Sequence, residues 1–162
     1  MMIGVISDTH GLLRPEALAA LGGVERILHA GDIGKPGILT ELEKVAPVTA
    51  VRGNNDREAW ARNIAERERI VFGGVRILVL HDLKELEADE ADDCDVVVSG
   101  HSHRPAVERR GSVLYVNPGS AGPRRFSLPV SVARLDTRDG YVRAEIVELD
   151  VAAPKSRRKR KR

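Results

Sequence analysis

The chain has 162 residues, of which 42% are hydrophobic, so it is long and apolar enough to form one globular domain with a buried core. It contains no uninterrupted apolar run of transmembrane length and no signal peptide pattern at its start, so we expect no membrane association. The single cysteine, Cys94, excludes an internal disulfide and fits a reducing cytoplasm, where we expect the protein to reside. We expect Cys94 to be a packing residue, because its neighbours in sequence are acidic.

The formal net charge of +2 conceals an uneven distribution. The final eight residues, KSRRKRKR, hold seven of the 26 basic residues and no acidic one, which leaves 19 basic against 24 acidic residues, a net charge of −5, in the rest. A basic run of this kind repels itself and has nothing to bury, so we expect a domain over residues 1–153 and a disordered tail over residues 154–162. Because aromatic residues make up only 3% of the chain, the body is not expected to bind nucleic acid, and only the tail could attract it.

The first half of the chain alternates between apolar strand patterns and helical patterns. We expect strands at 2–7, 25–30 and 48–52. We expect helices at 15–21, 37–45 and 57–65. Proline stands at the start of the first helix and Gly22-Gly23 at its end, as the preferences for helix termini favour.

The second half is richer in strands. Residues 69–72 and 75–80 flank Gly73-Gly74 and predict a hairpin, and residues 83–91 predict a charged helix. Further strands are expected at 96–99, 106–108, 113–117, 130–136 and 141–149. Parallel units followed by antiparallel strands predict an α/β fold, in which two mixed β-sheets pack as a sandwich flanked by helices.

Polar residues able to bind metals or substrates follow five of the expected strands. They are Asp8 and His10, then Asp32, then Asn54, Asn55 and Asp56, then His81, and finally His101 and His103. In open α/β sheets, ligands bind beyond the carboxyl ends of the strands. Any one of these residues could be a solvated loop residue, but five strands with such residues at one edge predict a functional site.

The segment GHSH places two of the five histidines one residue apart. In extended chain, residues i and i+2 point to the same side, so His101 and His103 are expected to face a common object. The alternative is a polar loop with two solvated imidazoles. His29 lies inside an expected strand, and we expect it to be a packed, hydrogen-bonded structural residue.

In that order, DTH, GD, GNND, H and GHSH resemble the five motifs of the calcineurin-like metallophosphoesterases, and NPGS at 117–120 resembles their compact bacterial and archaeal phosphodiesterase branch. The resemblance implies the αββα fold of that family and a site with two metal ions. It implies that the first ion is held by Asp8, His10, Asp32 and His103. It implies that the second is held by Asp32, Asn54, His81 and His101, with Asp32 as the bridge.

The implied activity is hydrolysis of a small phosphodiester by a metal-bound hydroxide. A donor set of nitrogen and oxygen without thiolate suits manganese, iron, nickel or zinc, and the family favours Mn²⁺. The competing hypothesis is a non-catalytic interaction scaffold of the same fold, like the retromer subunit. All seven ligand positions are present, which favours the enzyme. The sequence leaves a homo-oligomer open.

Two positions depart from the family pattern. Asn55 stands where many relatives have a histidine or cysteine that assists the leaving group, and an amide can offer only a hydrogen bond. Outside the metal ligands, we expect Asn55 and its neighbour Asp56 to be the catalytic residues. Asp82 replaces a usual glycine after His81, where it either orients that histidine or crowds the substrate. Of Arg124 and Arg125, one contacts phosphate or both are surface residues.

Overall fold

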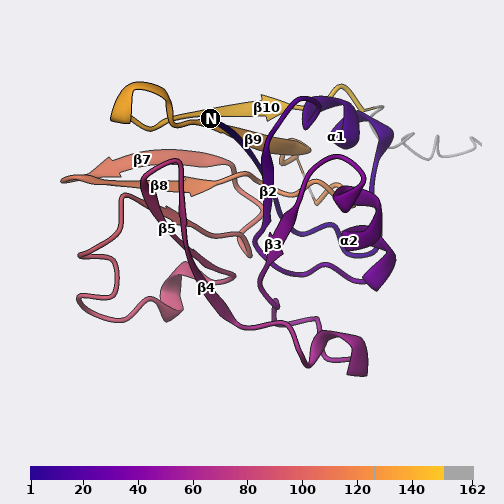
Figure 1. Cartoon of the computed structure of the whole chain (residues 1–162). Coiled ribbons are helices and arrows are strands. Elements are labelled where there is room, and N and C mark those ends of the chain that lie inside the picture. Colours follow the sequence, from indigo (N-terminus) through magenta and orange to yellow (C-terminus); the bar gives the residue numbers. More distant parts are fainter. Residues whose placement is uncertain (126, 152–162) are drawn as a thin grey trace, which may run out of the picture.

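The computed structural model describes residues 1–125 and 127–151. The expected basic tail at 154–162, and its boundary with the domain after residue 153, lie outside the described residues. The described part consists of two five-stranded sheets with two α-helices (Figure 1). Neither helix in this part of the chain is long and apolar enough to cross a membrane.

The first sheet has the strand order β10-β9-β1-β2-β3. Its strands are β1 (Met2–Ile6), β2 (Arg26–His29), β3 (Val48–Ala50), β9 (Ser131–Asp136) and β10 (Arg143–Glu148). The strands β1, β2 and β3 pair in parallel, whereas β9 and β10 are antiparallel additions at the β1 side. The carboxyl ends of the three parallel strands therefore meet at one edge.

The second sheet has the order β4-β5-β6-β8-β7. Its strands are β4 (Arg67–Phe72), β5 (Val75–Leu80), β6 (Val96–Val98), β7 (Ala106–Arg110) and β8 (Val113–Asn117). Here β5, β6 and β8 are parallel, and the edge strands β4 and β7 are antiparallel to their neighbours. Two mixed sheets confirm the expected α/β sandwich.

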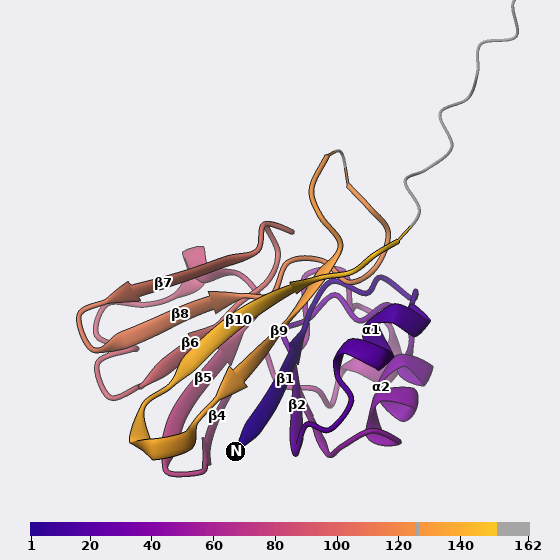
Figure 2. The same cartoon turned by 90° about the horizontal axis from the view of Figure 1, so that it is seen from above.

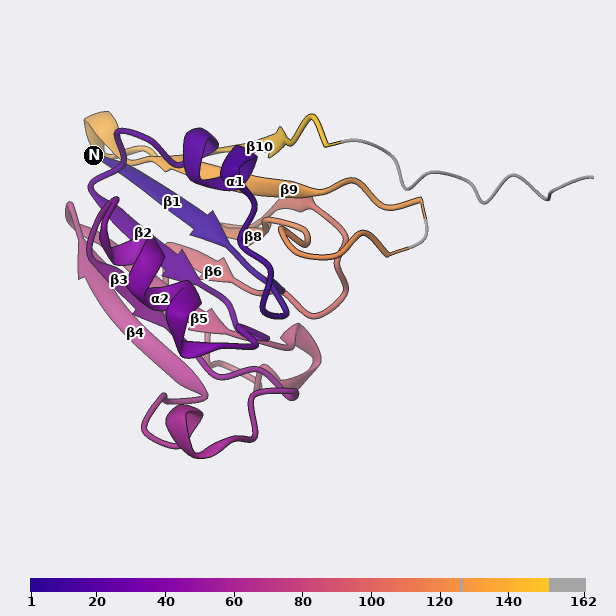
Figure 3. The ribbon, with the colours of Figure 1, turned by 90° about the vertical axis from the view of Figure 1, so that its right-hand side faces the viewer.

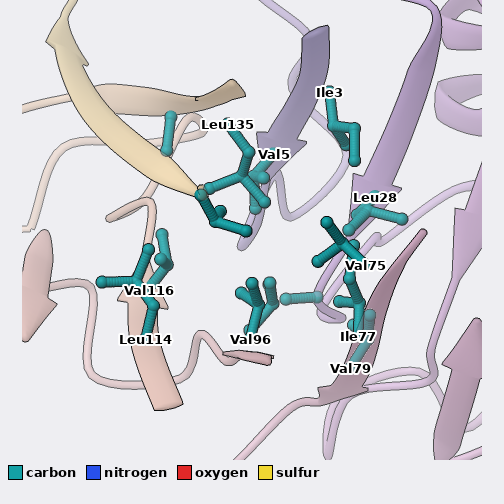
Figure 4. Close-up of a cluster of buried hydrophobic side chains, with 14 of the residues drawn as sticks. Ile3, Val5, Leu28, Val75, Ile77, Val79, Val96, Leu114, Val116 and Leu135 are labelled. Carbon is teal, nitrogen blue, oxygen red and sulfur yellow. The ribbon is translucent and has the colours of Figure 1, made fainter. Parts of the chain in front are cut away.

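The two sheets bury a shared apolar core, and the helices cover the outer face of the first sheet (Figure 2). Figure 4 shows Val5, Val96 and Leu114 among the side chains that meet between the sheets. Full burial of an aliphatic side chain of this size contributes about 1.5–3 kcal/mol. Since this core fixes the two sheets against each other, it also fixes the strand ends that carry the predicted site.

The helices α1 (Pro15–Ala20) and α2 (Pro36–Glu43) each begin with proline. Proline is favoured at the first helical position because its fixed φ suits the helix and its missing N–H removes no intrahelical bond. The side chains of Ile38 and Leu42, four residues apart, share one face of α2 and are buried against the first sheet. The helices thus form the third layer of the molecule.

Two expected helices are wrong. Residues 57–65 contain only the short 3₁₀ turn η1 (Ala59–Ala61), and residues 83–91 contain only η2 (Leu83–Glu85) followed by turns. In the second segment, contacts with the neighbouring strand β4 override the helical propensity. Arg67 donates to the Glu90 carboxylate at 2.7 Å, and Arg69 donates to the Glu90 backbone carbonyl at 2.6 Å.

Turns rather than a helix therefore cover the outer face of the second sheet. Three apolar side chains on this face, Leu78, Leu80 and Val97, pack with Cys94, which is buried as expected for a packing residue. The hairpin at Gly73-Gly74 is confirmed, because Phe72 pairs with Val75 across two glycines at positive φ.

Candidate metal centre

The predicted site residues follow the carboxyl ends of parallel strands in both sheets. Asp8 lies two residues beyond β1 and Asp32 three beyond β2, in the first sheet. In the second sheet, His81 directly follows β5, and the GHSH segment follows β6. The arrows of β1, β2, β5 and β6 point in the same direction (Figure 3). Both sheets therefore present these residues at the same end of the sandwich.

Three of the predicted residues form one group of nitrogen and oxygen donors around Asp8. The Nε2 atom of His103 lies 3.3 Å from Asp8 Oδ1, and that of His10 lies 3.7 Å from the same oxygen. The two Nε2 atoms are 3.4 Å apart. One donor atom from each residue lies within 4.8 Å of the others, which is close enough to share one metal ion.

A second group shares Asp8 and adds Asp32 and His81. His81 Nε2 lies 3.3 Å from Asp32 Oδ2 and 4.0 Å from Asp8 Oδ1. The other ring nitrogen, Nδ1, donates to the backbone carbonyl of Ala30 at 2.7 Å, so the ring is oriented with Nε2 towards the carboxylates. Asp32 Oδ2 is also 3.7 Å from His10 Nε2. Both carboxylates therefore face histidines of both groups.

Asn54 and His101 complete the predicted set on the exposed side of the second group. Asn54 Oδ1 and His101 Nδ1 are 3.2 Å apart, and the His101 ring stands nearly perpendicular to that of His81 at 5.2 Å between centroids. The side chain of His101 is 44% exposed, whereas those of His81 and Asp8 are almost inaccessible. Asp82 Oδ2 lies 3.7 Å from His101 Nε2, so Asp82 is close to His101 as well as to His81.

The local backbone explains how His101 and His103 reach different groups. Both have positive φ, 69° and 61°, so the extended-chain reason for their convergence is wrong. Among the described residues, seven other than glycine have positive φ, and five of these are predicted metal ligands, namely Asp8, His10, Asp32, His101 and His103. Residues other than glycine rarely adopt a positive φ, and backbone strain of this kind is concentrated at functional sites. No pattern in the sequence predicts these positive φ angles.

The carboxylate of Asp8 is held so that one oxygen faces the site. The Ser7 hydroxyl donates to Oδ2 at 2.6 Å and the backbone N–H of His101 donates to it at 3.1 Å. Asp8 Oδ1 and His81 Nε2 are buried and form no hydrogen bond with the described residues. Buried polar atoms are normally paired, so these two fit a cation between them. Ser7 was not predicted, although it directly precedes Asp8.

The electrostatics of the site also require positive charge. Burial by itself would raise the pKa of Asp8, but its contacts with His10 and His103 hold that pKa below its usual range. Burial opposes protonation of His81, yet its contact with Asp32 and the charge of Asp8 raise its pKa to about 9. Two ionised carboxylates in a buried site need compensating charge, which a proton on His81 or a metal ion provides.

The two predicted catalytic residues face Asp32 and the backbone. Asn55 donates to both oxygens of Asp32, from its backbone N–H at 2.9 Å and from its side-chain amide at 3.0 Å. Asp56 is 3% exposed, and its carboxylate accepts backbone N–H groups of Ile33, Gly34 and Gly53 at 2.9–3.1 Å. Asp56 therefore ties together the two loops that carry Asp32 and Asn54.

His29 is a structural residue, as expected. It is fully buried, and its Nδ1 accepts the backbone N–H of Gly31 at 3.1 Å. That leaves Nε2 to donate to the Thr9 hydroxyl at 3.0 Å, and Thr9 in turn donates to the backbone carbonyl of Ile33. The imidazole is paired on both sides and takes no part in the donor groups.

Comparisons with known proteins identify the family of this chain. A family model described as the calcineurin-like phosphoesterase superfamily domain matches residues 1–140. A probable metallophosphoesterase of Methanothermobacter thermautotrophicus is 40% identical over 151 residues, which cover 84% of this chain and 87% of that relative. The chain therefore belongs to the calcineurin-like phosphoesterase superfamily, and the resemblance of its five motifs is confirmed.

Solved structures show the same fold. A structure described as a novel archaeal phosphodiesterase has a TM-score of 0.75 and 27% identity, with 91% of this chain and 100% of that one covered. Vps29 from Chaetomium thermophilum has a TM-score of 0.73, with 92% and 97% covered, at 21% identity. The second likeness concerns the fold alone.

Proposed function

We propose that this protein is a phosphodiesterase whose site holds two divalent metal ions, with Mn²⁺ as the first choice and iron, nickel or zinc as alternatives. One observation carries the proposal. The buried carboxylates of Asp8 and Asp32 face the Nε2 atoms of His10, His81 and His103, while Asp8 Oδ1 and His81 Nε2 have no hydrogen-bond partner among the described residues. The donor set is nitrogen and oxygen, which suits these metals.

In this proposal the first ion is held by Asp8, His10, Asp32 and His103, and the second by Asp32, Asn54, His81 and His101. Two bound dications would polarise the phosphoryl oxygens and lower the pKa of a bound water, so that hydroxide could attack phosphorus in line. Four positive charges against two carboxylates and one hydroxide leave the site slightly positive, which attracts a phosphate ester.

The protein's own residues position this chemistry. Asn55 orients Asp32 through its two hydrogen bonds, and Asp56 holds the loops behind it, so we assign both to positioning rather than to proton transfer. His101 and Asn54 lie on the exposed side, where a substrate would enter. This assignment leaves no side chain to donate a proton to the leaving group. Esters whose leaving group departs without protonation should therefore react fastest.

The alternative is an interaction scaffold, which the structural likeness to Vps29 keeps open. The observation against it is that five of the seven predicted ligands lie in two adjoining donor groups, and three of these five have a buried polar atom without a hydrogen-bond partner among the described residues.

Hydrolysis of bis(p-nitrophenyl) phosphate by metal-stripped protein, before and after addition of Mn²⁺, tests the proposal. A phosphodiesterase releases p-nitrophenol only after the metal is added, and a variant with His81→Ala releases much less. Absence of turnover with Mn²⁺, Fe²⁺, Ni²⁺ and Zn²⁺ would instead favour the scaffold.

A further inference from the structure

A cavity of about 600 Å³ adjoins the candidate metal centre and extends over the outer face of the second sheet. It is lined by His101, Gly100 and Asn117 and, farther along β7 and β8, by Tyr115 and Arg110. Its volume lies within the range of sites for small molecules. The metal-centre residue His101 is thus shared between the cavity and the proposed reaction site.

The cavity is longer than an aryl group. Its floor includes Ala106, Glu108 and Arg110, alternate residues of β7 that share one face of the strand. At the rise of a β-strand, the four steps from Ala106 to Arg110 span about 13 Å. A phenyl ring would leave most of that length empty, whereas a nucleoside that carries a further phosphate would extend along it.

The charge of the cavity favours an anion. Its basic lining residues are Lys84, Arg104, Arg110 and Arg125, and its acidic ones are Asp82 and Glu108. Glu108 is paired with Arg110 at 3.1 Å, and Asp82 lies beside His101. The ion pairs found among residues 1–125 and 127–151 include none of the other three cations. The side chains of Lys84, Arg104 and Arg125 are therefore available to bind a negatively charged group of a ligand.

The far end of the cavity offers a surface for a planar ring. The guanidinium carbon of Arg110 lies 4.5 Å from the centre of the Tyr115 ring. Aromatic rings and guanidinium planes both stack against nucleobases, and this stacking discriminates little between one base and another. Leu83, from the turn η2, adds an apolar side chain to the lining of the cavity.

We propose that this cavity binds the nucleoside arm of a phosphodiester, with the base against Arg110 and Tyr115 and a further phosphate near Lys84, Arg104 and Arg125. The proposal rests on the proposed phosphodiesterase function and adds its substrate class, nucleotide esters. Hydrolysis would consume one water, break the P–O bond to the other arm, release that arm as an alcohol with one proton of the water, and leave the nucleotide.

Three p-nitrophenyl phosphodiesters with the same leaving group test the proposal by turnover. Their second arms are methyl, thymidine joined through its 5′ oxygen, and the same thymidine carrying a 3′-phosphate. We expect KM to fall in that order, by about tenfold at each step if each new contact contributes one factor of ten in affinity. Arg110→Gln should reduce the preference for the nucleoside esters over the methyl ester, and Lys44→Gln, which removes one charge just after the end of α2 and outside the cavity, should not.

Binding of thymidine 3′-phosphate to the metal-stripped protein, measured by saturation-transfer NMR, separates this proposal from the proposed function. We expect contact between the base protons and the protein, with a Kd raised in Arg110→Gln and Tyr115→Leu and unchanged in Lys44→Gln. The Arg110 side chain is 53% exposed, so its replacement should leave the fold intact. Equal Kd values in all variants, or no binding, would overturn the subsite even if all three esters are hydrolysed. Specific binding without any turnover would overturn the proposed function and leave the subsite.

Discussion

Asn55 holds Asp32 by two hydrogen bonds, one from its backbone N–H to Oδ1 and one from its side-chain amide to Oδ2. Asp32 is the carboxylate that the family motifs assign as the bridge between two ions. Side chains that orient a metal ligand affect metal affinity and rate without contacting the metal. The departure from the family pattern at position 55 therefore has a structural role.

Asn55→Ala should lower the affinity for Mn²⁺ by about 10- to 100-fold, because the Asp32 carboxylate loses the hydrogen bond from the Asn55 side-chain amide and keeps only the one from the backbone N–H. The dependence of log rate on leaving-group pKa, measured at saturating Mn²⁺ over a series of aryl diesters, should keep its slope. A steeper slope with unchanged metal affinity would show that Asn55 acts on the leaving group instead.

Asp32→Asn should reduce the rate more than a change to any other single ligand, since Asp32 Oδ2 faces His10 and His81 together. We expect a loss greater than about 100-fold, beyond the range seen when only an orienting residue is changed. Asp92→Asn, which removes an equal charge from an exposed position, is the matched control and should leave the rate unchanged. Near-normal turnover of the Asp32 variant would contradict the assignment.

Gly100→Ala should damage both stability and metal binding. A Cβ atom at Gly100 would stand 2.6 Å from Asp8 Oδ2 and even closer to the Ser7 hydroxyl, so the hydrogen-bonded pair that positions Asp8 would have to move. Overpacking of this kind costs about 1–3 kcal/mol. The control, Gly37→Ala, places its Cβ in open space within α2 and should be neutral or slightly stabilising in chemical denaturation. Equal effects of the two substitutions would refute the crowding argument.

The stability of the folded protein should fall in mild acid because of His29. Burial lowers its pKa to about 4 in the folded state, from 6.5. Between those values the unfolded chain binds a proton that the folded protein does not, so the free energy of unfolding rises with pH across this interval. The contribution of His29 is fully present above pH 6.5 and is lost as the pH falls towards 4, by about 3 kcal/mol at most.

Urea denaturation at pH 4 to 7.5 measures this dependence. His29→Gln should flatten the change between pH 6.5 and 4, even if it lowers stability at every pH. An unchanged slope in that variant would mean that other groups account for the acid sensitivity.

The strands, and the edge at which the candidate site residues gather, could be predicted from sequence because each depends on local signals. Apolar runs such as 2–7 and 75–80 mark buried strands, and polar residues directly after them mark the functional edge of the sheets. Five of the seven predicted ligands lie close together, as expected where parallel strands bring their carboxyl ends to one edge. The family model matches residues 1–140, a range that contains all five motifs.

Features that depend on tertiary contacts could not be predicted in this way. The helix expected over 83–91 has strong helical propensity, but Arg67 and Arg69 bind Glu90 and hold the segment in turns. The positive φ angles of His101 and His103 likewise follow from the packed loop rather than from their own preferences. The role expected of Asn55 rested on the family pattern, whereas its contact with Asp32 depends on loop geometry that the sequence does not specify.

The number of Mn²⁺ ions bound per chain tests the central claim most directly. Metal-stripped protein is dialysed against increasing Mn²⁺, and bound metal is measured by mass spectrometry while hydrolysis of bis(p-nitrophenyl) phosphate is followed in the same samples. We predict that binding saturates at about two ions per chain and that activity appears as the second ion binds, as expected for a two-metal site. Saturation with one ion or none, or full activity before the second ion binds, would contradict the account.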